Sequence, residues 1–120
     1  MIITVPIEEG RPAAHFGRCP CFMMFTINDR SREIIDRQTL PAPPHEPGAY
    51  PRWLRGHGAD VVLARGMGRK ALRLFTRAGI CVVLGVPSLT AEELVAAYLD
   101  GELSDGINTC THGPDHRCPN

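Results

Sequence analysis

Residues 60–85, "DVVLARGMGRKALRLFTRAGICVVLG", decide the fold of this chain. The apolar runs "DVVLARG" at the start and "ICVVLG" at the end are typical of buried strands. Between the two runs, apolar residues recur at helical spacing: Met67, Ala71, Leu72, Leu74, Phe75. Gly79 then ends the helical pattern. A strand, a helix and a second strand in succession predict a right-handed crossover between two parallel strands.

The flanking sequence adds strands before this unit and a helix after it. "MIITVPI" reads as a first strand, and "CFMMFTIND" and "REIIDRQTL" read as the two strands of a hairpin. "YPRWLRGHG" fits a short helix, and "SLTAEELVAAYLDG" shows a capping signature, Thr90 with Glu93 three residues later. We therefore predict an α/β protein with a mixed sheet, largely parallel, in which the hairpin contributes an antiparallel strand.

Length and composition favour one globular domain, with a separate tail. The 120 residues suit a single domain, which we assign to residues 1–107, followed by a Cys/His-rich tail, residues 108–120. The thirteen acidic and thirteen basic residues are interspersed along the sequence. We therefore expect no positively charged surface of the kind that binds nucleic acid, and no nucleic-acid partner. No stretch approaches the roughly 20 apolar residues of a membrane span, and no leader is apparent, so we expect a cytoplasmic protein that does not bind membranes.

The loop after the first strand is the first candidate site. Ligands of open α/β sheets bind beyond the carboxyl ends of the strands, where the strand order reverses. This loop contains the following residues: His15, Phe16, Gly17, Arg18, Cys19, Pro20, Cys21. An imidazole, a cation and two thiolates suit a thiophilic metal or a metal-sulfur cluster. Cys19 and Cys21 fit equally well as small buried residues at the head of a strand.

The turn before the central helix is the second candidate. "RGMGRKAL" is a glycine-rich turn into a helix, and it contains Arg65, Gly66, Met67 and Gly68. The full dinucleotide and phosphate-loop patterns are missing, so the turn indicates only an anion or a close approach of the backbone. Tight packing between the strand and the helix explains the glycines as well.

Cys110, His112, His116 and Cys118 form a third candidate, in the tail. These residue types suit tetrahedral zinc, although all four fall within nine residues, unlike the usual paired spacing of structural zinc sites. Three interpretations stay open: a self-contained zinc site, a free end, or a ligand arm whose first half serves the His15 and Cys19 loop.

Together these motifs resemble a known family. "HFGRCPCF", residues 44–80, "EELVAAYLDGEL" and "NTCTH" resemble, in this order, the dinitrogenase iron-molybdenum cofactor biosynthesis family, that is, the small NifX-like and NifB C-terminal-like proteins. The resemblance covers nearly the whole chain, to His112. It implies a three-layer α/β/α fold of ribonuclease H-like type, with a five-stranded mixed sheet that includes an antiparallel hairpin strand.

The resemblance also implies a function. Members look like non-enzymatic carriers of metal-sulfur clusters or cofactor precursors, with iron and molybdenum, or molybdenum and copper, as the metals. By this resemblance residues 15–19 match the His-Phe-Gly loop, residues 66–68 match the glycine turn, and Cys110 with His112 matches a frequent Cys-x-His ending. The family commonly has a small residue where this chain has Arg65. The implied partners are cluster-biosynthesis or acceptor proteins.

The leading hypothesis is a cytoplasmic cluster-binding protein, either a monomer or a weak homodimer. It places the cofactor at residues 15–19, at Cys21 and at residues 65–68, with Cys19 and the four tail residues as metal ligands. One alternative is a zinc-binding structural or regulatory protein that uses the tail. Another is a thiol redox protein that uses Cys19 and Cys21, which requires a low thiol pKa. A nuclease is disfavoured, because the predicted strands carry no carboxylates for Mg²⁺.

Overall fold

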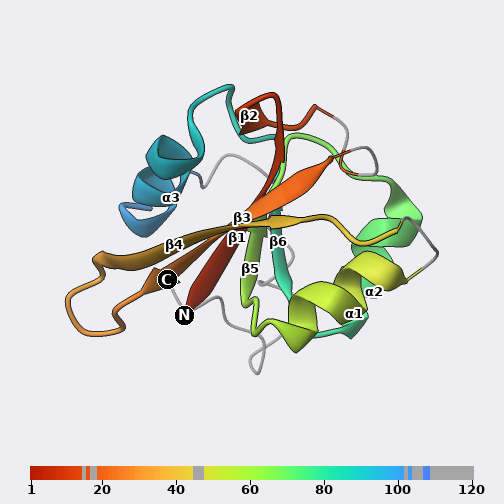
Figure 1. Cartoon of the computed structure of the whole chain (residues 1–120), viewed down its shortest axis with the longest axis horizontal. Coiled ribbons are helices and arrows are strands. Elements are labelled where there is room, and N and C mark those ends of the chain that lie inside the picture. The colour runs from red at the N-terminus through yellow and green to blue at the C-terminus, as the bar shows by residue number, and fades with distance from the viewer. Residues whose placement is uncertain (15, 17–18, 45–47, 102, 104–106, 109–120) are drawn as a thin grey trace.

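A computed structural model describes residues 1–14, 16, 19–44, 48–101, 103 and 107–108 of the chain (Figure 1). The strands are β1 (Ile2–Glu8), β2 (Arg11–Pro12), β3 (Cys21–Ile27), β4 (Ile34–Pro41), β5 (Val61–Leu63), β6 (Cys81–Leu84) and β7 (Ile107–Asn108). The helices are α1 (Ala49–Gly56), α2 (Arg69–Arg77) and α3 (Ala91–Leu99). All three predicted helices and all five predicted strands are confirmed. The two-residue strands β2 and β7 were not predicted, because such short strands leave no periodic signal.

The strands form one mixed sheet in the order β4-β3-β1-β5-β6-β7, and β2 pairs with β1. The three central strands β1, β5 and β6 are parallel. The hairpin β3-β4 joins antiparallel to β1, so Cys21 lies opposite Ile7 on one side and opposite Pro41 on the other. The mixed sheet with its hairpin is therefore confirmed. The predictions of five strands and of a largely parallel sheet are wrong: β2 and β7 bring the sheet to seven strands, and four of the six pairs among the described strands are antiparallel.

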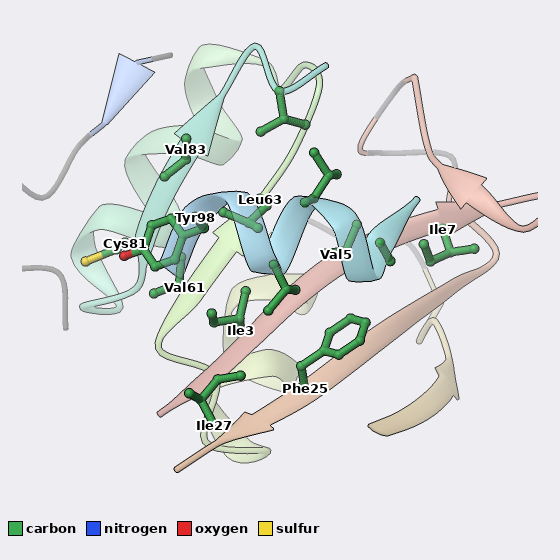
Figure 2. Close-up of a cluster of buried hydrophobic side chains, with 14 residues drawn as sticks. Ile3, Val5, Ile7, Phe25, Ile27, Val61, Leu63, Cys81, Val83 and Tyr98 are labelled. Atoms are coloured by element: carbon green, nitrogen blue, oxygen red, sulfur yellow. The ribbon is translucent and has the colours of Figure 1, made fainter. Parts of the chain in front are cut away.

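Helices cover both faces of the sheet, which gives three layers (Figure 1). On one face, Ile3, Val5 and Ile7 of β1 pack in the same buried cluster as α3, shown in Figure 2. On the other face, Leu54 of α1 and Phe75 of α2 belong to a second buried cluster. Strand β5 is buried along its whole length, because it has a helical layer on each side. The three layers are confirmed, and the ribonuclease H-like assignment stays a prediction.

The three helices begin at the same edge of the sheet. The carboxyl ends of β1, β5 and β6 meet there because these strands are parallel. Helices α2 and α3 follow β5 and β6 directly. Helix α1 follows β4, and the last residue of β4, Pro41, lies at this edge as well, because Pro41 pairs with Cys21 and Cys21 pairs with Ile7 near the end of β1. We call residues 9–14, 16, 19–20, 64–68 and 85–90 the carboxyl edge.

The starts of α2 and α3 differ in their capping. The Thr90 side chain accepts a hydrogen bond from the Glu93 backbone N–H at 3.1 Å, and the Glu93 carboxylate accepts one from the Thr90 N–H at 3.0 Å. This capping box satisfies the first turn of α3, as the sequence predicted. Gly68 precedes α2 and offers no side-chain cap. The first N–H groups of α2 therefore have no such partner at the carboxyl edge.

Within the described ranges, no helix has the length and apolar composition that crossing a bilayer requires.

Candidate functional site

The two loops that the sequence singled out meet at the carboxyl edge. A Cβ atom on Gly66 would lie 3.5 Å from the backbone carbonyl oxygen of Ala14. The Ala13 N–H donates to the Pro6 carbonyl at 2.8 Å, and the Ala42 N–H donates to the Pro20 carbonyl at 3.0 Å. These bonds fix both ends of the first loop to the sheet. His15, Gly17 and Arg18 lie outside the described residues.

The glycine turn is held by the two parallel strands beside it. The Gly85 N–H donates to the Arg65 carbonyl at 3.2 Å, and the Val86 N–H donates to the Ala64 carbonyl at 3.3 Å. The Arg65 side chain is exposed. Its guanidinium therefore stands at the same edge as the uncapped N-terminus of α2, and both favour negative charge.

Phe16 of the first loop packs into a buried aromatic cluster. Its side chain is only 4% exposed, and its ring centroid lies 5.1 Å from that of Phe75, 5.3 Å from that of Tyr50 and 5.8 Å from that of Phe22. The contacts with Tyr50 and Phe75 are edge-to-face, the arrangement that aromatic rings prefer. The contribution of Phe16 to cofactor binding stays a prediction, and the structure shows its ring packed among these aromatic side chains.

Cys19 is buried in the same aromatic cluster. Its side chain is 4% exposed, and burial raises the pKa of its thiol to about 12. A backbone hydrogen bond and the Tyr50 hydroxyl, which donates to the sulfur, lower that pKa in part. The pKa of Tyr50 is raised as well, first by burial and then by the negative charge that Cys19 carries when it is deprotonated. Cys19 is therefore a neutral thiol near pH 7.

Cys21 faces the opposite side of the sheet. Its half-buried side chain packs against the α3 cluster, whereas Cys19 belongs to the cluster beneath α1 and α2. The Cys21 thiol lies 3.8 Å from the Ile7 carbonyl oxygen, to which it donates a weak hydrogen bond. A thiol redox catalyst needs a lowered thiol pKa and two sulfurs that approach each other. The raised pKa of Cys19 and the opposite faces argue against this alternative.

The pKa of Cys19 predicts how stability depends on pH. The folded pKa lies above the value of 9.0 for an unperturbed thiol, so the stabilisation is complete below pH 9 and is lost as the pH rises toward 12. Over that range the Cys19 contribution falls by at most about 1.4 kcal/mol per pH unit. We expect the difference in free energy of unfolding between the wild type and Cys19→Ala to shrink above pH 9. Urea titrations between pH 7 and 11 measure it, and a constant difference would contradict the buried thiol.

The predicted metal ligands are not gathered in the described part of the chain. No group of three or more His, Cys, Asp or Glu side chains suited to a metal occurs among the described residues. Cys19 is described, whereas Cys110, His112, His116 and Cys118 lie outside the described residues. The ligand set that includes the tail therefore stays a prediction.

The direction of β7 bears on the tail. Ile107 lies opposite Leu84 and Asn108 lies opposite Val83, so the strand runs from the carboxyl edge toward the amino end of β6. At Asn108, the last described residue, the chain therefore runs away from the first loop. A ligand arm that serves Cys19 has to reverse its direction after this point.

Sequence reasoning missed Tyr50 as a neighbour of Cys19. Tyr50 lies in the first turn of α1, and its ring contacts Phe16 and Phe22 at the base of the first loop. The only available signal was its place directly after a proline-rich connection that leads into a helix. That signal does not specify a contact with a cysteine 31 positions earlier in the chain.

Known proteins share this fold and sequence. Residues 1–101 match the family described as dinitrogenase iron-molybdenum cofactor. An uncharacterized protein of Methanocaldococcus jannaschii is 30% identical over 107 residues, which are 86% of this chain and 89% of that protein. The crystal structure of PH0822 has a TM-score of 0.77 at 30% identity and covers 85% of this chain and 91% of its own. The apo form of the orange protein from Desulfovibrio gigas has a TM-score of 0.69 at 25% identity, with coverages of 84% and 88%.

The fold and the edge define a small three-layer α/β protein in which two loops and a helix N-terminus meet beyond the sheet. The chain belongs to the dinitrogenase iron-molybdenum cofactor family. The resemblance found in the sequence is thereby confirmed.

Proposed function

We propose that this protein binds an anionic metal-sulfur cluster, or a precursor of one, as cargo at the carboxyl edge, without catalysing a reaction. The observation that carries the proposal is the junction of the two loops, where Gly66 approaches the Ala14 carbonyl beside the uncapped start of α2. Membership of the dinitrogenase iron-molybdenum cofactor family supports this class of cargo.

The groups at this junction fit an anion better than a bare cation. Backbone N–H groups at the start of α2 and the exposed Arg65 and Arg69 side chains offer hydrogen bonds and positive charge. At Gly68 no atom lies within 4 Å of the place that a Cβ atom would take, so a ligand can approach the backbone there. Iron and molybdenum, or molybdenum and copper, bridged by sulfide are the proposed metals, since such clusters carry negative charge on sulfur.

Cys19 is not an anionic ligand in the structure as it stands. A bond between its sulfur and a metal requires loss of the thiol proton, which burial opposes. We therefore assign the first capture of the cluster to Arg65 and the α2 N-terminus. Ligation by Cys19 is a second step that releases a proton, so it strengthens as the pH rises.

Anaerobic reconstitution tests the proposal. The purified apo-protein is incubated either with iron and sulfide or with tetrathiomolybdate and Cu(I), then desalted, and its metal content and visible absorption are measured. We expect the wild type to retain one of these clusters. Arg65→Gln should bind about tenfold more weakly, because it removes one charge-assisted hydrogen bond worth roughly 1.4 kcal/mol.

The matched control is Arg77→Gln, which removes the same charge at the far end of α2. It should leave retention of the cluster unchanged. A wild type without iron, molybdenum or copper would refute the proposed function. Equal losses in Arg65→Gln and Arg77→Gln would instead refute the assignment to the carboxyl edge.

A zinc site in the tail is a separate candidate, and the direction of β7 favours its independence from the carboxyl edge. The full-length variant Cys118→Ser tests it. If the tail binds zinc, this variant loses zinc and keeps its capacity for the cluster. Zinc content equal to that of the wild type removes this candidate.

A further inference from the structure

The positive charge of this neutral protein is concentrated in one helical layer. Within residues 48–89, which contain α1 and α2, the cationic side chains are Arg52, Arg55, Arg65, Arg69, Lys70, Arg73 and Arg77. Asp60 is the one acidic residue of this range, and its carboxylate accepts a hydrogen bond from the Ile2 N–H at 2.9 Å. The expectation that acidic and basic residues are interspersed is therefore wrong for this part of the chain, because the net charge of zero for the whole chain hides a local excess of positive charge.

On α2 the cations form a continuous stripe. Arg69, Lys70, Arg73 and Arg77 fall within an arc of about 100° at 3.6 residues per turn, and all four are exposed. Phe75, which is fully buried, lies on the opposite side of the helix. The ion pairs between described residues are Met1 with Asp29 and Arg37 with Glu92, so none of them neutralises the stripe.

Helix α1 adjoins the far end of this stripe. The Arg55 guanidinium of α1 donates a hydrogen bond to the Ala78 carbonyl at the end of α2. A Cβ atom on Gly79 would lie 3.0 Å from the same guanidinium. The two helices therefore present their cations on a shared surface, which we call the basic layer and define by Arg52, Arg55, Arg69, Lys70, Arg73 and Arg77.

The opposite helical layer has the opposite sign. Helix α3 carries Glu92 and Glu93 in its first turn, ends at Asp100 and contains no basic residue. It lies across the sheet from α1 and α2 (Figure 1). Arg37 of β4 pairs with Glu92 and offsets part of this negative charge, so the asymmetry of charge rests mainly on the basic side. A local excess of charge orients a charged partner before contact even when the net charge of the molecule is zero.

We propose that the basic layer docks an acidic protein that delivers the cluster or receives it, an inference that rests on the proposed function. The stripe begins at Arg69, directly after the glycine turn of the carboxyl edge. A protein seated on α2 therefore reaches the edge where the cargo is held. Arginine supplies most of the charge, and arginine is the cation that protein interfaces favour.

Two features favour a protein over a nucleic acid as the partner. The nine residues of α2 span only about 14 Å, which is short for the continuous tracks that bind a phosphate backbone. In addition, eight of the nine acidic residues in the described part of the chain lie outside residues 48–89. These acidic residues would repel a long polyanion that extends beyond the basic layer, whereas a compact acidic protein surface does not reach them.

Binding of a model acidic chain to the apo-protein tests the docking surface. The probe is poly-L-glutamate of about 30 residues, the number that one side of a standard interface contributes. We expect salt-sensitive binding, with amide shifts on α1 and α2 and none on α3. The triple variant Lys70→Gln, Arg73→Gln, Arg77→Gln should bind on the order of tenfold more weakly. It keeps Arg65 and Arg69, so cluster retention should be unchanged.

The matched control removes three exposed cations elsewhere, Arg11→Gln, Arg30→Gln and Arg37→Gln, and therefore has the same net charge. It should bind the probe like the wild type. No binding, or equal losses in both triple variants, would refute the docking surface. Tighter binding of oligodeoxythymidylate of equal charge, with the same dependence on α2, would assign the layer to nucleic acid instead. Because the probe binds the apo-protein, this experiment tests the docking surface alone, and a failure of cluster binding would be seen only in the reconstitution experiment.

Discussion

Replacing Phe75 by alanine is expected to lower the free energy of unfolding by about 3–5 kcal/mol. Phe75 is 0% exposed and is the only residue of α2 that is fully buried. Its ring meets that of Phe16 edge-to-face at a centroid distance of 5.1 Å. The variant loses the burial of a large side chain together with this ring contact, and it leaves a cavity between α2 and the sheet.

The loss should also reach the candidate site, because Phe16 belongs to the first loop of the carboxyl edge. We expect Phe75→Ala to retain less cluster than the wild type under conditions in which both are folded. Arg73→Ala is the control, since it changes an exposed position of the same helix and should alter stability by less than about 0.5 kcal/mol. Urea unfolding followed by the fluorescence of Trp53, the single tryptophan, measures the change. Similar values for both variants would contradict the assigned packing of α2.

Replacing Leu94 by alanine should lower the free energy of unfolding by about 2–5 kcal/mol. Leu94 is 0% exposed, lies in α3 and belongs to the same buried cluster as Ile3 and Val5 of the central strand. Glu92→Ala on the same helix is the control. It removes the exposed ion pair in which the Glu92 carboxylate lies 2.7 Å from Arg37, and such pairs contribute less than about 1 kcal/mol.

Comparing Leu94→Ala with Phe75→Ala tests which helical layer affects the binding of the cluster. Because the sheet lies between Leu94 and the first loop, this variant should keep its capacity for the cluster while folded, unlike Phe75→Ala. The costs of the two substitutions should add to within about 0.5 kcal/mol in the double variant, since they share no contact. A coupling larger than that would show that the clusters are not independent, and loss of the cluster in Leu94→Ala would place the cargo on the other face.

Most of the fold follows from local patterns in the sequence. The crossover of residues 60–85 was predictable because two apolar runs flank a helical repeat, and these features became β5, α2 and β6. The start of α3 was predictable because Thr90 and Glu93 have the spacing of a capping box. The strand β7 was not, since its pairing with β6 depends on long-range register and not on a pattern within two residues.

The candidate site was predictable to the level of loops. The rule for open sheets placed the two loops at one edge, and the approach of Gly66 to Ala14 agrees with it. The states of the two cysteines were not predictable. Cys19 and Cys21 are two positions apart, yet one packs beneath α1 and α2 and the other packs against α3. The irregular backbone between them breaks the alternation on which a sequence pattern depends.

The sequence by itself determined the order and type of the elements, the family, and the edge at which ligands are expected, because each rests on residues close together in the chain. Only the tertiary structure decided that Tyr50 meets Cys19, that burial keeps this thiol neutral, and that β7 leads away from the first loop. The same holds for the gathering of cations on one layer opposite the acidic α3. These properties depend on which distant segments come into contact and how far they exclude water, and local sequence patterns encode neither.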